Sequence, residues 1–181
     1  IHAKKALELF VKLLDPNDPK IANSSTDLGH LHRRMGDYKS SEYYYLQAIG
    51  IIEKVYGVDN EEYASCLNNL GTLYWFMGDY IFVETYFKKS LDLIEKNYDI
   101  KHKYYAPTLN NLAGYFITVG DYDSAIPALK KALEIKKRMK GESNEDYAST
   151  LGNLASCYLS IGDYKSAEIY LKKTVEIYKK A

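Results

Sequence analysis

Paired asparagines are the side chains of this sequence whose type and spacing could do chemistry. Asn68 and Asn69 lie together in "LNNLGTLYWFMGDY", residues 67–80, and Asn110 and Asn111 lie together further along the chain. A side-chain amide offers two N–H donors and a carbonyl acceptor, so it can bond both the N–H and the C=O of an extended peptide. Asparagine is also a poor helix former, because its short amide competes for nearby backbone groups. The pairs therefore predict either peptide binding or a role within the scaffold, in which the amides bond neighbouring helices or are simply solvated. The sequence supports both interpretations equally.

Other reactive side chains lack the partners that catalysis or metal binding requires. His30 and His32 are two residues apart, so on a helix they would not share a face. The sequence contains no glycine-rich phosphate loop, zinc-binding helix motif or nucleophile elbow. Cys66 and Cys157 form no disulfide framework, which favours a reducing, cytoplasmic setting. We therefore expect a protein that is not an enzyme and that uses no cofactor and no metal ion.

The composition limits the kinds of partner. The 24 basic and 24 acidic residues give a formal net charge of zero, which argues against binding to nucleic acid or to an anionic membrane. A hydrophobic content of 46% argues against intrinsic disorder. The sequence has no apolar run approaching the roughly 18 residues of a transmembrane helix. Another protein is the partner that this composition favours.

A repeat positions the asparagines. The tripeptide Gly-Asp-Tyr recurs with a constant spacing of 42 residues, beginning at Gly36, Gly78, Gly120 and Gly162. Leucines hold the same register at Leu28, Leu70, Leu112 and Leu154, and small residues hold it at Ala22, Ala64, Ala106 and Ala148. Internal repeats of this length indicate a stack of identical supersecondary units. The third asparagine of the register is Asn153.

Each repeat predicts two helices joined by the Gly-Asp-Tyr turn. Apolar residues recur every three or four positions on both sides of the turn, as helices require. In the second repeat Gly78 can end the first helix with a positive φ, and Asp79 can cap the helix that follows. Pro107 fits the first turn of a helix, whereas we place Pro16 and Pro19 in a connection between helices.

The register divides the chain into repeats of a single domain, residues 1–181. We expect residues 1–15 to form the second helix of a truncated repeat, followed by four full repeats at 20–59, 60–101, 102–143 and 144–181. Neither end carries a polar capping helix, and a stack of repeats needs covered ends. We therefore expect a fragment of a longer array, or an array whose ends another chain covers.

The pattern Leu-Gly/Ala…Tyr…Gly-Asp-Tyr…Ala…Tyr/Phe…Ala-Leu resembles the tetratricopeptide repeat (TPR) over essentially the whole chain. The 42-residue period, with "YASCLNNLGTLY" and "IEKVYG", resembles the kinesin-light-chain-like subclass, since the usual TPR period is about 34 residues. Ser41 and Val83 depart from the alanine of the family, and His32 departs from its aromatic residue. The resemblance implies an all-α, right-handed superhelical solenoid of antiparallel helix pairs. It also implies that the first helices line a concave groove that binds peptide segments.

The resemblance assigns a candidate binding groove to these first helices. Asn69, Asn111 and Asn153 would form a ladder of amides that bonds a peptide backbone, which demands little of the bound sequence. Further polar or anchoring positions in the groove are Asn68, Asn110, Thr72 and Phe76, and a basic patch is formed by His30, Arg33 and Arg34. The paired lysines and arginines with which some TPR modules bind a C-terminal carboxylate are missing from the groove positions.

These observations favour a non-enzymatic adaptor or scaffold that binds an extended or short helical segment of another protein. The alternatives are a module that self-assembles into homo-oligomers through its uncapped ends, and a regulatory or sensor array within a larger multidomain protein. The cluster "KKRMK", residues 136–140, resembles a localisation signal, but we interpret it as a solvated helix end, where cations favour the helix dipole.

Overall fold

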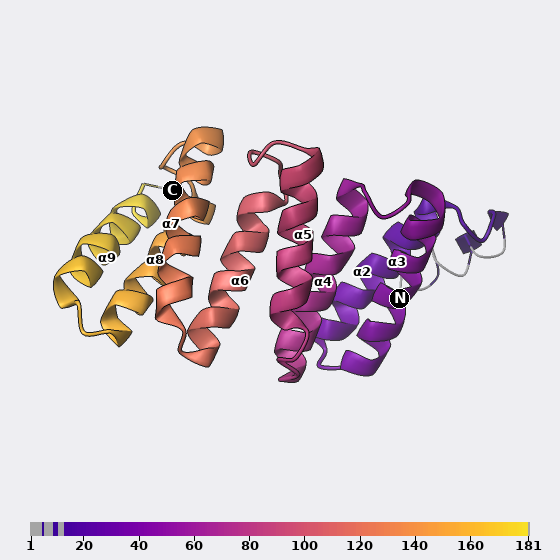
Figure 1. Ribbon diagram of the computed structural model, residues 1–181, viewed down its shortest axis with the longest axis horizontal. Helices are drawn as coiled ribbons and strands as arrows, with labels where there is room; N and C mark the ends of the chain where they lie inside the picture. Colours follow the sequence, from indigo (N-terminus) through magenta and orange to yellow (C-terminus); the bar gives the residue numbers. More distant parts are fainter. Residues whose placement is uncertain (1–4, 6–8, 11–12, 181) are drawn as a thin grey trace. The chain divides into compact units, whose positions relative to one another are not determined.

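A computed structural model describes residues 5, 9–10 and 13–180 of the chain. This part contains eight α-helices and no strand, which confirms the predicted all-α class (Figure 1). The helices alternate between first and second members of pairs: α2 (Pro19–Arg34), α3 (Tyr38–Tyr56), α4 (Glu61–Met77), α5 (Val83–Asn97), α6 (Tyr105–Val119), α7 (Tyr122–Lys140), α8 (Glu145–Ser160) and α9 (Tyr164–Tyr178). None of these helices is long and apolar enough to cross a membrane.

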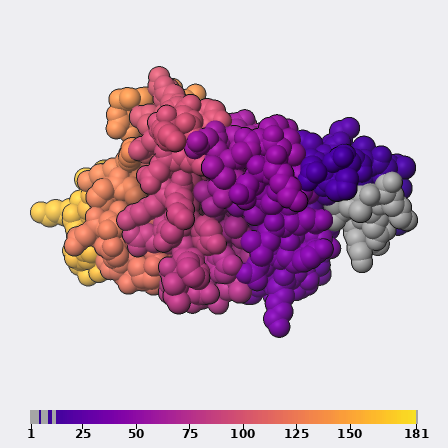
Figure 2. All heavy atoms as spheres, turned by 45° about the vertical axis from the view of Figure 1, so that its right-hand side comes forward, coloured from indigo at the N-terminus to yellow at the C-terminus, as the bar shows by residue number. Residues whose placement is uncertain are grey.

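The chain divides into two compact units, residues 1–97 and 98–181, which we call unit 1 and unit 2. In unit 1, α2 packs on α3, α3 on α4, and α4 on α5. In unit 2, α6 packs on α7, α7 on α8, α8 on α9, and the first helices α6 and α8 also touch. In Figure 2 the side chains of unit 1, coloured purple to magenta, form a continuous surface over the helices of that unit. Within each unit, every helix thus contacts its neighbours in the sequence, as in a helical repeat solenoid.

The Gly-Asp-Tyr turn ends one helix and begins the next. Gly78 and Gly120 adopt the left-handed conformation at φ 75° and 80°, and their N–H groups bond carbonyls of the preceding turn. A residue without a Cβ adopts this conformation without strain. At the start of α3, α7 and α9, an aspartate accepts the backbone N–H of the serine three residues later, in the pairs Asp37–Ser40, Asp121–Ser124 and Asp163–Ser166. These caps satisfy N–H groups that a helix start leaves without partners.

The second repeat departs from this rule, so the predicted cap at Asp79 is wrong. Helix α5 begins at Val83, and residues 80–82 form a turn instead of the first turn of a helix. The cause is the local sequence, which places Phe82 where the other three repeats have serine. The Phe82 ring contacts the Tyr74 ring of α4 and the Tyr86 ring of α5, at centroid distances of 6.2 and 6.4 Å. This aromatic contact replaces the capping bond.

Proline positions agree with the prediction in one case and differ in another. Pro107 lies in the first turn of α6, as expected. Pro19 is not in a connection between helices, because it is the first residue of α2, with Asp18 as the N-cap. The first helical position suits proline because its missing N–H would have no intrahelical partner there. The helix predicted over residues 1–15 lies largely outside the described residues.

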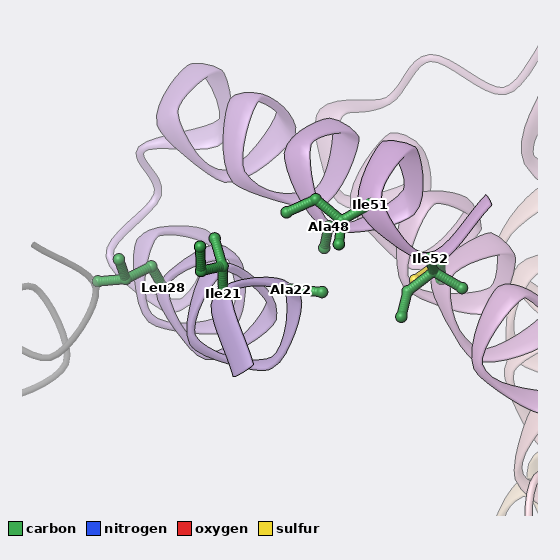
Figure 3. Packing of buried hydrophobic residues seen from close by; sticks show 7 residues of the cluster. Ile21, Ala22, Leu28, Ala48, Ile51 and Ile52 are labelled. Atoms are coloured by element: carbon green, nitrogen blue, oxygen red, sulfur yellow. The ribbon is translucent and has the colours of Figure 1, made fainter. Parts of the chain in front are cut away.

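The core of unit 1 forms where the apolar face of α2 packs against the apolar face of α3. Figure 3 shows Ile21 of α2 directed toward Ala48 and Ile51 of α3. Phe10 and Leu14 pack against the same cluster and are partly buried. A second cluster joins α3 to α4 and consists of Tyr45, Leu70 and Leu73. Burial of these side chains fixes which face of each first helix remains outward.

Small residues bring the two helices of a pair close together. A Cβ atom on Gly29 would lie far inside van der Waals contact of the Tyr45 ring. A Cβ atom on Gly71 would lie 3.1 Å from the Phe87 ring. In the other two repeats the same register positions hold alanine opposite leucine, Ala113 with Leu129 and Ala155 with Leu171. An aromatic ring therefore occurs where its neighbour has no Cβ.

Candidate peptide-binding site

One stripe of α4 carries three of the predicted groove residues. Asn68, Thr72 and Phe76 are each four residues apart, so they lie on one face of the helix. Asn68 and Thr72 are half-buried, and Phe76 is 53% exposed. The Thr72 hydroxyl donates to the Asn68 carbonyl at 2.9 Å, a bond within the helix. The opposite face of α4 is buried in the core through Leu70 and Leu73. The stripe thus presents an amide, a hydroxyl and an exposed aromatic ring on one side of unit 1.

The first helix of the preceding repeat adds positive charge to this stripe. The Arg33 guanidinium of α2 lies over the Phe76 ring, 4.8 Å from its centroid. Arg33 is half-buried and its neighbour Arg34 is exposed. A cation over an aromatic face is attracted by the ring quadrupole, and this attraction holds both side chains in one geometry. Arg33 and Phe76, which come from successive repeats, therefore belong to one surface.

His30 is directed into the repeat rather than toward that surface. Its Nδ1 forms a 2.7 Å hydrogen bond with the Tyr45 hydroxyl, and the two rings meet edge to face at 5.4 Å. Burial lowers the pKa of His30 below its ordinary value, and the nearby Arg33 charge lowers it further. His30 is therefore neutral at pH 7, and the positive charge of the patch comes from Arg33 and Arg34.

The three asparagines of the predicted ladder differ in burial. Asn69 on α4 is buried, with 9% of its surface exposed. Asn111 on α6 and Asn153 on α8 are half-buried. A buried amide is held by its own protein's packing, whereas a half-buried amide keeps one side accessible. Of the three, Asn111 and Asn153 are thus the more accessible to a ligand.

Asn110 links two first helices inside unit 2. Its Oδ1 accepts a hydrogen bond from the Thr150 hydroxyl of α8 at 3.1 Å. The Lys136 ammonium of α7 donates to the same hydroxyl at 2.8 Å. The amide at this position therefore bonds a neighbouring helix, which was one of the two interpretations that the sequence allowed.

Lys136 departs from the interpretation of residues 136–140 as a solvated helix end. Lys137, Arg138 and Lys140 are exposed as expected, but Lys136 is half-buried. A signal for this placement is present in the sequence, because Lys136 stands in register with Ile52 and Ile94, which are 3% and 0% exposed. The register thus identifies a cation at a core position.

Within residues 13–180 and the few described before them, no group of three or more His, Cys, Asp or Glu side chains could hold a metal ion. Cys66 and Cys157 are buried free thiols. Burial raises the pKa of the Cys66 thiol to about 12, which keeps it protonated and unreactive.

Solved structures resemble this fold closely. BtubC (BKLC) from P. vanneervenii matches with a TM-score of 0.83 and 23% sequence identity, over 98% of this chain and 70% of that protein. A Podosopora anserina protein, described as a kinesin light chain with nearly identical TPR-like repeats, matches with a TM-score of 0.74 and 16% identity, over 98% of this chain and 84% of that one. MamA matches with a TM-score of 0.66 and 18% identity, over 98% of this chain and 85% of that protein.

The sequence places the chain in a family. No curated protein sequence matches it. The family model of the tetratricopeptide repeat matches residues 1–54, 28–96, 78–138 and 104–180, which together span nearly the whole chain. The chain therefore belongs to the tetratricopeptide repeat family, and its fold is that of the kinesin-light-chain-like structures among its neighbours.

Proposed function

We propose that this chain is a scaffold that binds a peptide segment of a partner protein on the first helices of unit 1, α2 and α4. Tetratricopeptide repeats mediate protein–protein interaction, and this chain consists of such repeats. The observation that carries the proposal is the exposed Phe76 ring under the Arg33 guanidinium, beside Asn68 and Thr72 on the same stripe. We call these four residues the unit 1 binding face.

The chemistry of the unit 1 binding face suits a short peptide. An exposed aromatic ring buries a large apolar area against a ligand at a low cost in side-chain entropy, and arginine is the other common anchor of interfaces. The Arg33–Phe76 contact orients both side chains before a ligand arrives, which reduces the ordering cost of binding. The Asn68 amide carries donor and acceptor groups of the kind that bond a peptide backbone. In unit 2, the half-buried Asn111 and Asn153 supply the same groups.

A selection from random peptides tests the proposal and requires no named partner. A displayed peptide library is selected against the purified protein, and the affinity of the recovered peptide is measured by calorimetry for the wild type and for Phe76→Ala. We expect the substitution to weaken binding about tenfold or more, as for an aromatic hot spot. Because Phe76 is 53% exposed, the melting temperature should change little.

A matched control comes from the second helices. Tyr43 on α3 is 63% exposed, so Tyr43→Ala removes a similarly exposed aromatic ring away from the proposed face. Equal affinity of Phe76→Ala and the wild type would contradict the proposal. So would a loss of affinity in Tyr43→Ala that matches the loss in Phe76→Ala. Light scattering on the same samples tests the alternative of self-assembly, which predicts a mass that rises with concentration.

A further inference from the structure

A small cavity in unit 2 is lined by three lysines and one acid. It has a volume of about 50 Å³ and lies between the start of α6, the end of α7 and the start of α8. Its charged lining residues are Lys103, Lys136, Lys140 and Asp146, and the other lining residues are Ala106, Pro107 and Met139. The cavity is at the end of unit 2 opposite the Gly-Asp-Tyr turns, and it shares no residue with the unit 1 binding face.

The three lysines belong to this repeat alone. In the same register, Lys103 corresponds to Glu61 and Glu145, and Lys140 corresponds to Tyr56 and Tyr98. Lys136 corresponds to the core isoleucines Ile52 and Ile94. The repeats share one packing scheme, so the demands of the fold recur in each of them. A cation that replaces a core isoleucine costs desolvation free energy, which an apolar residue at this position avoids.

The partial burial of Lys136 changes the pKa of its ammonium group. Desolvation lowers the pKa of Lys136 below its ordinary value, the Asp146 charge opposes this shift, and the Lys140 charge adds to it. The ammonium donates to the Asp146 carbonyl at 3.0 Å and to the Thr150 hydroxyl at 2.8 Å. An ammonium has three N–H groups, so two such bonds leave donor capacity on the side of the cavity.

The lining of the cavity carries more positive than negative charge. The Lys140 ammonium pairs with the Asp146 carboxylate at 3.0 Å, so this one carboxylate faces two ammonium groups of α7, those of Lys136 and Lys140. The Lys103 ammonium lies over the Tyr104 ring, 4.8 Å from its centroid. Asp146 is the one acidic residue among the lining residues. An excess of cations around a small, partly buried space attracts an anion more strongly than the same charges would in open solvent.

We infer that this cavity is a binding site for one oxyanion, a carboxylate or a phosphate group. A volume of about 50 Å³ has room for a few water-sized groups, which is the size of such an oxyanion. Ammonium groups form short, charge-assisted hydrogen bonds with carboxylate and phosphate oxygens. The oxyanion comes either from a free metabolite or ion, or from an acidic side chain of a bound protein. The two sources share their chemistry, and the test below separates a phosphate group from a carboxylate.

Nuclear magnetic resonance titration of the whole chain tests the site. Inorganic phosphate and N-acetylglutamate are added in parallel to the ¹⁵N-labelled protein, with sodium chloride at equal ionic strength as the reference. We expect saturable shifts of the amides of Ala106, Met139 and Asp146 with at least one oxyanion and not with chloride. Saturation by phosphate alone indicates a phosphate group as the ligand, and saturation by N-acetylglutamate alone indicates a carboxylate.

Two substitutions and a control assign the shifts to the lysines. Lys136→Ile restores the residue type that the first two repeats carry, so we expect it to fold, and we expect it to weaken oxyanion binding roughly tenfold or more. Lys140→Met tests the second cation in the same way. Lys137→Met is the control, because Lys137 is an exposed neighbour that does not line the cavity.

The outcomes are separable from those for the peptide face. Saturable shifts that persist in Lys137→Met and weaken in Lys136→Ile and Lys140→Met support the site. Shifts that grow linearly with oxyanion concentration and that chloride reproduces at equal ionic strength overturn the site. Shifts that are equal in Lys136→Ile and the wild type also overturn it. None of these results depends on the affinity of a peptide for the unit 1 binding face, so either proposal can fail alone.

Discussion

At the scale of single residues, the spacing within a helix pair is set by complementary volumes. Tyr45 and Phe87 are among the largest fully buried side chains, and each lies against a glycine of the first helix. Leu129 is equally buried, at 0% exposed, and lies in register opposite Ala113. Protein interiors are close-packed, so a larger side chain on one helix requires a smaller one on the other. Glycine weakens the helix that carries it, and room for the aromatic ring compensates for this cost.

The two glycines predict different responses to alanine. In an open helix position, Gly→Ala stabilises by up to about 1 kcal/mol. At Gly29 the new methyl group would collide with the Tyr45 ring, so we expect a net destabilisation of about 1–3 kcal/mol. At Gly71 the nearest Phe87 atom would be 3.1 Å away, so we expect a smaller loss. Denaturant unfolding of both variants measures the difference.

A double substitution provides the control for this prediction. Gly71→Ala with Phe87→Leu reproduces the Ala113–Leu129 pair of the third repeat. We expect the two changes together to be less destabilising than the sum of the single changes, because the leucine makes room for the methyl group. Additive losses would show that the glycine is not required by the ring.

At the scale of elements, the starts of the second helices differ in how they are held. Helices α3, α7 and α9 begin at a capping aspartate, and hydrogen bonds from the serine lower the pKa of Asp37, Asp121 and Asp163. Helix α5 has no such cap and begins at Val83. Ile81 is left 79% exposed in the turn before it. Two departures from the repeat pattern, Ile81 and Phe82, therefore coincide with a shorter helix and with exposed apolar surface.

Restoring the pattern should lengthen α5. The variant Ile81→Lys, Phe82→Ser recreates the "GDYKS" of the first and fourth repeats. We expect α5 to begin at Tyr80. The new cap should raise the unfolding free energy by about 0.5–2 kcal/mol. The loss of the contacts of Phe82 with Tyr74 and Tyr86 should reduce this gain. Amide exchange protection and Cα chemical shifts of residues 80–83 measure the helix start. The reciprocal change in the first repeat, Lys39→Ile with Ser40→Phe, should delay the start of α3. A helix start unchanged in both variants would show that the cap does not set it.

At the scale of the whole molecule, each unit is tied together by contacts between elements far apart in sequence. In unit 2, Glu142 lies in the turn between α7 and α8 and pairs with Lys137 of α7. Its second oxygen pairs with Lys173 of α9 at 2.7 Å. One carboxylate therefore joins the end of α7 to α9, a helix that buries only Ala167 and Ile177 among its described residues.

This ion pair predicts an acid-sensitive contribution to the stability of unit 2. Hydrogen bonds from Lys137 and then Lys173 lower the pKa of Glu142 from its ordinary value of 4.5 to about 2. The stabilisation is therefore fully present above about pH 4.5 and is lost as the pH falls through about 2. Glu142→Gln should lose less unfolding free energy than the wild type over that interval. Urea unfolding at a series of pH values measures both slopes.

The control for the acid effect is a nearby carboxylate. Glu145 is exposed in the first turn of α8, and Glu145→Gln removes a nearby carboxylate that is not part of the Lys137–Glu142–Lys173 contacts. Salt at about 1 M should reduce the difference between wild type and Glu142→Gln, because exposed pairs are screened. Identical slopes for the wild type and Glu142→Gln at low salt would rule out the contribution.

Most of the fold could be predicted because the same apolar positions and turn residues recur in every repeat. The apolar register predicted the helix pairs, and Gly78 marked the end of α4. The start of α5 was not predicted, because an aspartate alone does not define the cap and the serine three residues later also takes part. Comparison of the four turns shows that Phe82 breaks the pattern.

The candidate site was less predictable, because burial depends on packing between helices. The sequence treats Asn69 and Asn111 as equivalent, yet Asn69 is buried and Asn111 is half-buried. Helical periodicity gives the face of a residue but not the depth at which neighbouring side chains cover it. The orientation of His30 toward Tyr45 depends on a contact between two helices and has no signal in the local sequence.

The pairing of glycine with an aromatic ring, and of alanine with leucine, has a consequence for how such an array can evolve. Genetic recombination between repeats with a breakpoint at the Gly-Asp-Tyr turn would separate Gly29 from Tyr45 or Ala113 from Leu129. A breakpoint between repeats would transfer each first helix together with the second helix that fits it. Repeats should therefore be duplicated, lost and exchanged as whole helix pairs. The breakpoints of these events should lie in the connections that precede α4, α6 and α8.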